Sequence, residues 1–138
     1  MTAPTVLVIE DDLASRELAV YLLQAAGMRV VAAANGTRGL AMGLAEDPDI
    51  VLCDMRMPGL SGCEVVQGLR ASAGWRRVPV VAVTANSMTS DRQKAIDDGF
   101  DDHLPKPIDP ERFAAQVQAY LAAASKATVA SDSAGEIS

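Results

Sequence analysis

The sequence predicts an α/β fold in which a five-stranded parallel sheet is covered by helices on both faces. Apolar runs of four or five residues recur along the chain, and continuous runs of this length are typical of strands buried on both sides. The segments between the runs have apolar residues at helical spacing. Hydrophobic residues make up 49% of the 138 residues but aromatic residues only 4%, so the core must consist of small and aliphatic side chains.

Four strands are predicted directly from the apolar runs. They span Val6–Ile9, Val30–Ala34, Ile50–Cys53 and Val80–Val83. A short fifth strand is predicted at His103–Leu104. Strands and helices therefore alternate five times along the chain, and right-handed crossovers then place helices on both faces of the sheet.

The first two helices are predicted from periodicity. The first ends at Gly27, a residue suited to a helix C-terminus. Its predicted apolar stripe consists of Ala14, Leu18, Tyr21, Leu22 and Ala25. The second helix contains Leu40 and Leu44, and Gly39 and Gly43 are expected to weaken it by up to about 1 kcal/mol each.

The remaining helices have clearer boundary signals. Ser61 and Glu64 form a capping box at the start of the third helix. The fourth is predicted over Ser87–Asp98, ends at Gly99, and has only a thin apolar stripe. The fifth begins with Asp109 as its N-cap. Its apolar face consists of Phe113, Val117, Tyr120 and Leu121.

The chain is predicted to contain one domain, over residues 1–124. Residues 125–138 are rich in Ala, Ser, Thr and Gly without periodicity, which is typical of a disordered tail or a linker. Trp75 lies in a loop ahead of Pro79 and is predicted to pack at the surface.

Composition and charge exclude several classes of function. The formal net charge is -6 and no basic stripe is present, which argues against direct binding to nucleic acid. The first apolar run stops at Glu10, too short for a signal peptide or a membrane span. Cys53 and Cys63 lack metal-ligand spacing and are too few for a secreted disulfide scaffold. A cytoplasmic protein without membrane contact is therefore expected.

Polar residues follow the predicted strands at the edge where parallel sheets bind ligands. They are Glu10, Asp11 and Asp12 after the first strand, Asp54 after the third, Thr84 after the fourth and Lys106 after the fifth. Converging carboxylates about 4 Å apart repel by roughly 4 kcal/mol at an effective dielectric of 20. A hard divalent cation such as Mg²⁺ offsets this repulsion. A carboxylate nucleophile, a bound metal ion, a lysine ammonium and a threonine hydroxyl in one place indicate a phosphoryl-transfer site.

Each residue also has a purely structural interpretation. A carboxylate after a strand is often a helix N-cap, and for Asp12 the two interpretations are equally weighted. Thr84 alone would be a turn residue, Lys106 alone a solvated lysine and Asp54 alone a loop acid. The functional interpretation rests on the fact that all four strands end in residues suited to the same phosphoryl-transfer chemistry.

Four motifs in this order resemble the receiver domains of two-component response regulators. They are Val6–Asp12, Asp54–Gly62, Val83–Asn86 and Lys106–Ile108, within a similarity over residues 5–124. The resemblance implies a flavodoxin-like (βα)5 fold with strand order 2-1-3-4-5. It also implies a signalling domain that catalyses only its own phosphorylation and slow autodephosphorylation.

The resemblance assigns a role to each matching residue. Asp54 would accept a phosphoryl group and contact Mg²⁺, or Mn²⁺ in its place. Asp11 would bind the metal directly, Glu10 through water, and the backbone carbonyl of Arg56 would be a further ligand. Thr84 would bind a phosphoryl oxygen.

Other matching positions imply charge pairing and switching. Lys106 would pair with another phosphoryl oxygen, and the bond before Pro107 is commonly cis in the family. His103 stands where Tyr or Phe is usual at the switch position, and a half-exposed strand residue is the alternative interpretation. Arg56, Ala85 and Asn86 occupy positions that modulate the site.

The implied partners are a histidine kinase or histidine phosphotransfer protein, and a downstream protein that contacts the fourth helix, fifth strand and fifth helix. Two forms remain open, a stand-alone regulator and a receiver excised from a hybrid histidine kinase or a DNA-binding regulator. A flavodoxin-like electron carrier is disfavoured because its phosphate loop offers hydroxyl and backbone donors rather than Glu10, Asp11 and Asp12. A haloacid-dehalogenase-type phosphatase is disfavoured because its second aspartate is replaced by Arg56.

Overall fold

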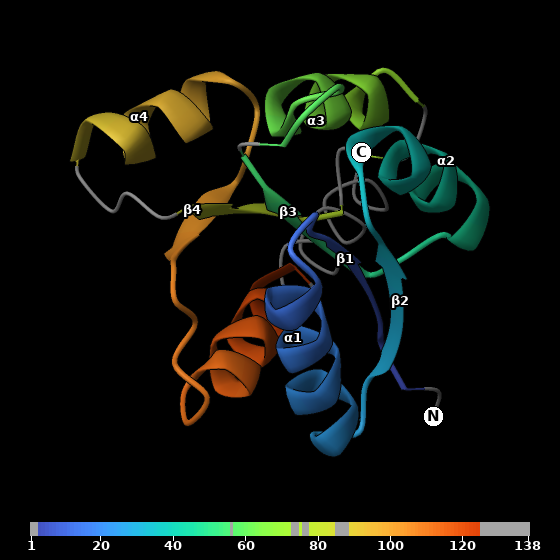
Figure 1. Ribbon diagram of the computed structural model, residues 1–138, viewed down its shortest axis with the longest axis vertical. Helices are drawn as coiled ribbons and strands as arrows, with labels where there is room; N and C mark the ends of the chain where they lie inside the picture. The colour runs from blue at the N-terminus through green and yellow to red at the C-terminus, as the bar shows by residue number, and fades with distance from the viewer. Residues whose placement is uncertain (1–2, 56, 73–74, 76–77, 85–88, 125–138) are drawn as a thin grey trace, which may run out of the picture.

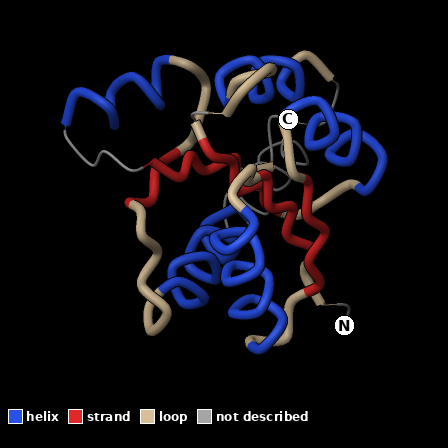
Figure 2. Tube along the Cα trace, viewed as in Figure 1, coloured by secondary structure: helices blue, strands red, loops and turns tan. Residues whose placement is uncertain are grey.

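The computed structural model describes residues 3–55, 57–72, 75, 78–84 and 89–124. Within them, five parallel strands form one sheet in the order β2-β1-β3-β4-β5, which confirms the predicted topology (Figures 1 and 2). The strands are β1 Thr5–Ile9, β2 Arg29–Ala33, β3 Ile50–Asp54, β4 Val80–Thr84 and β5 Asp102–Pro105. Each lies within two residues of its predicted position.

Helices cover both faces of the sheet (Figure 1). They are α1 Leu13–Ala25, α2 Gly36–Glu46, α3 Gly62–Arg70, α4 Thr89–Asp97 and a C-terminal helix over 113–124. Figure 1 shows α1 beside the C-terminal helix on one face, with α2 and α3 on the other. The predicted start of the fourth helix at Ser87 and the predicted tail over 125–138 lie outside the described residues. No helix in the described ranges combines the length and apolarity needed to cross a membrane.

Alternate residues of the central strands divide the core in two, because successive strand side chains point to opposite faces. On one face, Leu7 and Ile9 pack with Val65 and Leu69 of α3. On the other, the core residues include Val6, Val8, Leu23, Phe113 and Val117. The predicted apolar face of the C-terminal helix is therefore confirmed, and the sheet is fixed between two apolar layers.

The predicted caps at the end of α1 and the start of α3 are present, whereas Asp109, the predicted N-cap of the fifth helix, lies in a turn four residues before that helix begins at residue 113. Ser61 and Glu64 form a capping box at α3. Gly27 has φ 90 at the end of α1, a left-handed conformation that glycine adopts without steric cost. Backbone N–H groups of Arg112 and Phe113 donate to the carbonyl of Asp109, so a turn at Asp109 leads into the C-terminal helix.

The predicted stripe of α1 is wrong at most positions. Ala19 and Leu23 are the buried residues of α1, whereas Leu18 and Tyr21 are 38% and 69% exposed. Of the predicted stripe, Leu22 is partly buried and packs against the core. Two overlapping stripes occur at helical spacing in this segment, and the one that contains Ala19 and Leu23 faces the sheet.

The expected surface position of Trp75 is also wrong, because its side chain is only 7% exposed and belongs to the core. The glycines of α2 let this helix approach the same core layer closely. A Cβ on Gly43 would lie 2.8 Å from Leu69 Cδ2, and a Cβ on Gly39 would lie 2.5 Å from Ile9. The glycines thus permit close packing, a benefit that their helix propensity alone does not indicate.

Arg70 joins three segments at the opposite end of α3 from the capping box. Its guanidinium donates to the backbone carbonyls of Trp75 and Val78, the latter at 2.8 Å. It also pairs with Asp101 Oδ2 at 2.5 Å. The same Asp101 oxygen accepts from the backbone N–H of Val80 at 2.7 Å, so one side chain fixes the end of α3, the start of β4 and the approach to β5.

Candidate functional site

Three carboxylates meet at the carboxyl ends of β1 and β3. Ile9 and Cys53 are paired in register, so the next residues, Glu10 and Asp54, leave adjacent strands at the same level. Oxygens of Glu10, Asp11 and Asp54 all lie within 4.8 Å of one another. Glu10 and Asp54 are buried and Asp11 is exposed.

Lys106 lies between the two buried carboxylates. Its Nζ pairs with Glu10 Oε1 and lies 3.0 Å from Asp54 Oδ2. The backbone N–H of Lys106 donates to the carbonyl of Thr84 at 2.7 Å, which fixes the loop beside β4. The bond between Lys106 and Pro107 is cis, as the resemblance implied.

The electrostatics of this cluster are dominated by burial. Burial and the neighbouring Asp54 carboxyl raise the pKa of Glu10 to about 7, although Lys106 opposes the shift. For Lys106, burial favours the neutral amine, but the two carboxylates outweigh it and the pKa is raised. One ammonium therefore pairs with two buried carboxylates, and the exposed carboxylate of Asp11 lies within 4.8 Å of both acids.

The cluster has the donor chemistry of a Mg²⁺ or Mn²⁺ site. These cations prefer oxygen ligands and bind proteins through a few carboxylates plus water or phosphate oxygens. Glu10, Asp11 and Asp54 offer such oxygens around one point. A divalent cation there would offset the repulsion among these carboxylates.

Asp12 has the structural role. Its side chain accepts from the backbone N–H of Ser15 at 2.9 Å and caps α1. This hydrogen bond lowers the pKa of the Asp12 carboxyl. Of its two interpretations, the N-cap is confirmed.

Thr84 ends β4 and is buried, with 6% of its surface exposed. The preceding residue, Val83, is paired in register with Asp54, so the sheet brings the threonine to the same edge as the acids. Of the other predicted positions, Arg56, Ala85 and Asn86 lie outside the described residues.

His103 lies on β5 opposite Ala82. Its side chain is 15% exposed, and its Nδ1 lies 3.5 Å from Asp102 Oδ1. The hydroxyl of Tyr120 donates to the other oxygen of Asp102 at 3.1 Å. The residue is thus more buried than the half-exposed alternative required. Its strand partner Ala82 belongs to the core layer that contains Val65 and Ala95, so the imidazole lies on the face of the sheet opposite the C-terminal helix.

One contact at the site has no signal in the sequence. Arg16 of α1 donates from Nη1 to the backbone carbonyl of Glu10 at 2.9 Å. This bond fixes the chain at the point where β1 ends and the carboxylates begin. Neither the spacing of Arg16 nor its surroundings in the sequence distinguishes it from a solvated arginine.

A tight approach of α3 holds the backbone after Asp54. A Cβ on Gly62 would lie 2.6 Å from the Asp54 carbonyl oxygen and 2.8 Å from Met55 Cα. Gly62→Ala is therefore expected to lower the free energy of unfolding by roughly 1–3 kcal/mol, because backbone atoms must move. Urea denaturation measures this loss.

Gly68→Ala is the matched control in the same helix. Its Cβ would meet only the flexible end of Leu40, at 2.9 Å. The clash is easily relieved and alanine favours a helix by about 1 kcal/mol, so little or no destabilisation is expected. Equal losses for both variants would show that the approach of Gly62 to the Asp54 strand is unimportant.

Comparison with known proteins identifies the family. The model of the response regulator receiver domain matches residues 6–118. The chain belongs to the response regulator receiver domain family. Receiver domains are signalling domains of two-component systems, and the observed sheet order agrees with that of solved relatives. One is the chemotaxis protein CheY4 of Vibrio cholerae, with a TM-score of 0.79, 28% identity, and coverage of 86% of this chain and 98% of CheY4.

Other relatives of this receiver domain differ in length. The polar-differentiation response regulator DivK of Brucella anthropi is 32% identical, with 85% of this chain and 95% of DivK covered. The DNA-binding transcriptional regulator RpaA of Synechocystis is 36% identical over 86% of this chain, which spans only 49% of RpaA. The receiver domain of the Pseudomonas aeruginosa sensor kinase PA1611, solved with magnesium in its active site cleft, is 30% identical, with a TM-score of 0.75 and coverage of 87% and 95%.

Proposed function

We propose that this receiver domain accepts a phosphoryl group on Asp54, in a Mg²⁺-dependent reaction, from the phosphohistidine of a histidine kinase or phosphotransfer protein. The observation that carries the proposal is the position of Asp54. It is a buried carboxylate within 4.8 Å of two others, and its Oδ2 lies 3.0 Å from an ammonium. Such a group combines a nucleophile with the means to neutralise the charge of an incoming phosphoryl group.

In the proposed reaction, an oxygen of Asp54 forms a bond to phosphorus while the bond from phosphorus to the histidine nitrogen breaks. The electron pair of that bond goes to the imidazole, and the product is an acyl phosphate. Lys106 would move from Asp54 to pair with a phosphoryl oxygen, and the Thr84 hydroxyl would donate to another. A Mg²⁺ ion held by Asp11, Asp54, the Arg56 carbonyl and, through water, Glu10 would supply charge neutralisation.

Mg²⁺ is expected to raise the melting temperature, because the folded state gathers the three carboxylates and the unfolded state does not. Thermal unfolding across millimolar MgCl₂ measures the gain. Asp11→Ala should abolish it, since Asp11 is the exposed member of the cluster. Glu17→Ala, which removes an exposed carboxylate from α1, should retain it. A melting temperature that does not change with Mg²⁺ would contradict the metal site.

We further propose that phosphorylation shifts a two-state equilibrium, with Thr84 moving toward the phosphoryl group and His103 repacking. The downstream protein would contact α4, β5 and the C-terminal helix. The contact between Tyr120 and Asp102 supports this proposal, because it couples β5 to the C-terminal helix. Ala85 and Asn86, with Arg56, would adjust the lifetime of the acyl phosphate.

Addition of beryllium fluoride and Mg²⁺, a phosphoryl mimic, is expected to change amide resonances of β5 and the C-terminal helix as well as those around Asp54. Two-dimensional ¹H–¹⁵N NMR measures these changes. Shifts confined to the immediate neighbours of Asp54 would contradict the proposed output surface.

The proposed site of action is the cytoplasm, which the two free thiols, Cys53 and Cys63, favour. The proposal covers a protein that acts through protein contacts. It equally covers a receiver within a longer DNA-binding regulator, the form of RpaA. Phosphorylation of Asp54 is common to both, and intact-mass measurement after incubation with acetyl phosphate and Mg²⁺ tests it.

A further inference from the structure

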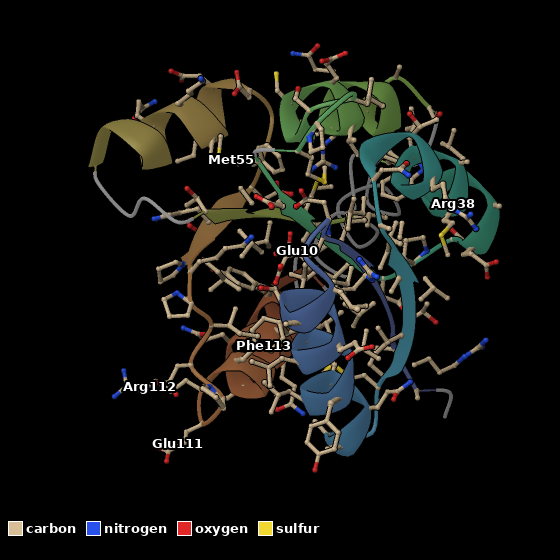
Figure 3. All side chains as sticks on the ribbon, viewed as in Figure 1. Glu10, Arg38, Met55, Glu111, Arg112 and Phe113 are labelled. Atoms are coloured by element: carbon tan, nitrogen blue, oxygen red, sulfur yellow. The ribbon has the colours of Figure 1, made fainter. Side chains whose placement is uncertain are left out.

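A cavity of about 270 Å³ lies beneath α1, between the sheet and the C-terminal helix. Its walls are mainly apolar and come from β1, α1, β3, β4 and the segment after Lys106. They include Val8, Ala19, Leu52, Val83, Ile108 and Phe113. Two of the lining residues, Phe113 and Glu10, are labelled in Figure 3. The reaction proposed for Asp54 does not use this apolar space.

The cavity follows from the way α1 packs. Ala19 faces the sheet and is 7% exposed, whereas its larger neighbour Leu18 is 38% exposed. Both residues line the cavity, and the small Ala19 side chain leaves space between the helix and Phe113 that a larger side chain would fill. Apolar cavities of about 150 Å³ stay dry and bind a benzene ring, so this one has room for a ring-sized apolar group.

One end of the cavity is charged. Glu10, Asp54 and Lys106 line it together with the apolar residues. Two carboxylates there outnumber one ammonium, and the carboxylate of Asp11 lies within 4.8 Å of both acids. The end of the cavity has a surplus of negative charge, which a bound cation would balance and a bound anion would increase.

We propose that this cavity binds a small organic cation, with a ring-sized apolar body against Val8, Ala19 and Phe113 and a primary ammonium or amidinium group at Glu10 and Asp54. Burial against the apolar walls favours an apolar ligand body. The excess of carboxylates over ammonium groups favours a cationic head group. Because the head group and a divalent cation use the same carboxylates, the ligand competes with Mg²⁺. The proposal does not depend on phosphorylation of Asp54.

Three probes with one ring but different charge test the proposal, namely benzylamine, benzyl alcohol and benzoate. Methyl ¹H–¹³C NMR of the Mg²⁺-free protein is expected to show saturable shifts at Val8, Leu52 and Val83 with benzylamine. Binding of benzyl alcohol should be roughly fivefold weaker, as expected for loss of a partly buried ion pair, and that of benzoate weaker still. Millimolar Mg²⁺ should weaken benzylamine binding and leave benzyl alcohol binding unchanged.

Ala19→Leu fills the cavity and is expected to remove the shifts, while phosphorylation by acetyl phosphate is retained. Val83→Ile is a milder second variant that should weaken binding severalfold. Ala41→Leu makes the same change as the first variant at an exposed position of α2 and should bind as wild type does.

Three results would overturn the proposal: no saturable shift in the wild type, equal affinity for the three probes, or undiminished benzylamine binding by a folded Ala19→Leu protein. If neither filling variant folds, the charge series and the Mg²⁺ competition in the wild type still decide the question. Failure here leaves the intact-mass result for Asp54 unaffected. Failure of Asp54 to accept phosphate likewise leaves the binding of the three probes unaffected.

Discussion

Arg70→Ala is expected to lower the free energy of unfolding by about 2–4 kcal/mol, because one guanidinium serves three acceptors. The substitution removes the donors to the carbonyls of Trp75 and Val78 and the partner of Asp101. The Arg70 side chain is 21% exposed, so water replaces the lost bonds only in part, whereas the half-exposed Asp101 is readily solvated. The loss should therefore come mainly from the two carbonyls and from looser packing of Trp75.

Urea denaturation measures this effect, with Arg112→Ala as the matched control. The Arg112 side chain is 79% exposed and its nitrogen lies 3.8 Å from Asp109, so its removal should change stability by less than about 0.5 kcal/mol. If Arg70→Ala and Arg112→Ala cost the same, Arg70 does not have the connecting role that its contacts indicate.

The sheet could be predicted from the sequence because parallel strands buried on both faces must be continuously apolar. The apolar runs around Leu7, Leu52 and Val81 therefore predicted buried strands. The face of α1 could not be predicted, because Leu18 and Tyr21 fit helical spacing as well as Ala19 and Leu23 do. Packing decided between the stripes and placed Ala19 and Leu23 against the sheet.

Trp75 was misplaced for a related reason. Its neighbours in the sequence are typical of an exposed loop, and the core residues that its ring joins, such as Leu7 and Val51, lie far away along the chain. The low helix propensity of glycine predicts a less stable helix. The benefit of glycine to packing depends on which side chains lie beside it in the folded protein.

The acidic site could be predicted because the ends of parallel strands converge at one edge of the sheet. Glu10, Asp11 and Asp54 do meet there, with Lys106 between two of them. The support from Arg16 could not be predicted, because a hydrogen bond from a side chain to a backbone carbonyl has no characteristic residue pattern. The same holds for the cavity beneath α1, whose existence depends on which stripe of that helix faces the sheet. The roles assigned to Arg56, Ala85 and Asn86 stay predictions.

Asp54→Asn is expected to abolish phosphorylation, the largest functional effect predicted here. The side-chain amide has nearly the shape of the carboxylate but is a poor nucleophile, and it cannot form the acyl phosphate. The buried position of Asp54, with its neighbouring ammonium, should tolerate the substitution well enough for the protein to fold. Asp12→Asn is the matched control, because asparagine caps a helix as well as aspartate does and Asp12 lies just outside the cluster of three carboxylates.

The most direct test is incubation of the wild type and the two variants with acetyl phosphate and Mg²⁺, followed by intact-mass measurement. The account predicts a phosphate-sized adduct on the wild type and on Asp12→Asn, its loss when Mg²⁺ is removed by chelation, and no adduct on Asp54→Asn. An adduct on Asp54→Asn equal to that on the wild type would contradict the assignment of Asp54 as the phosphoacceptor.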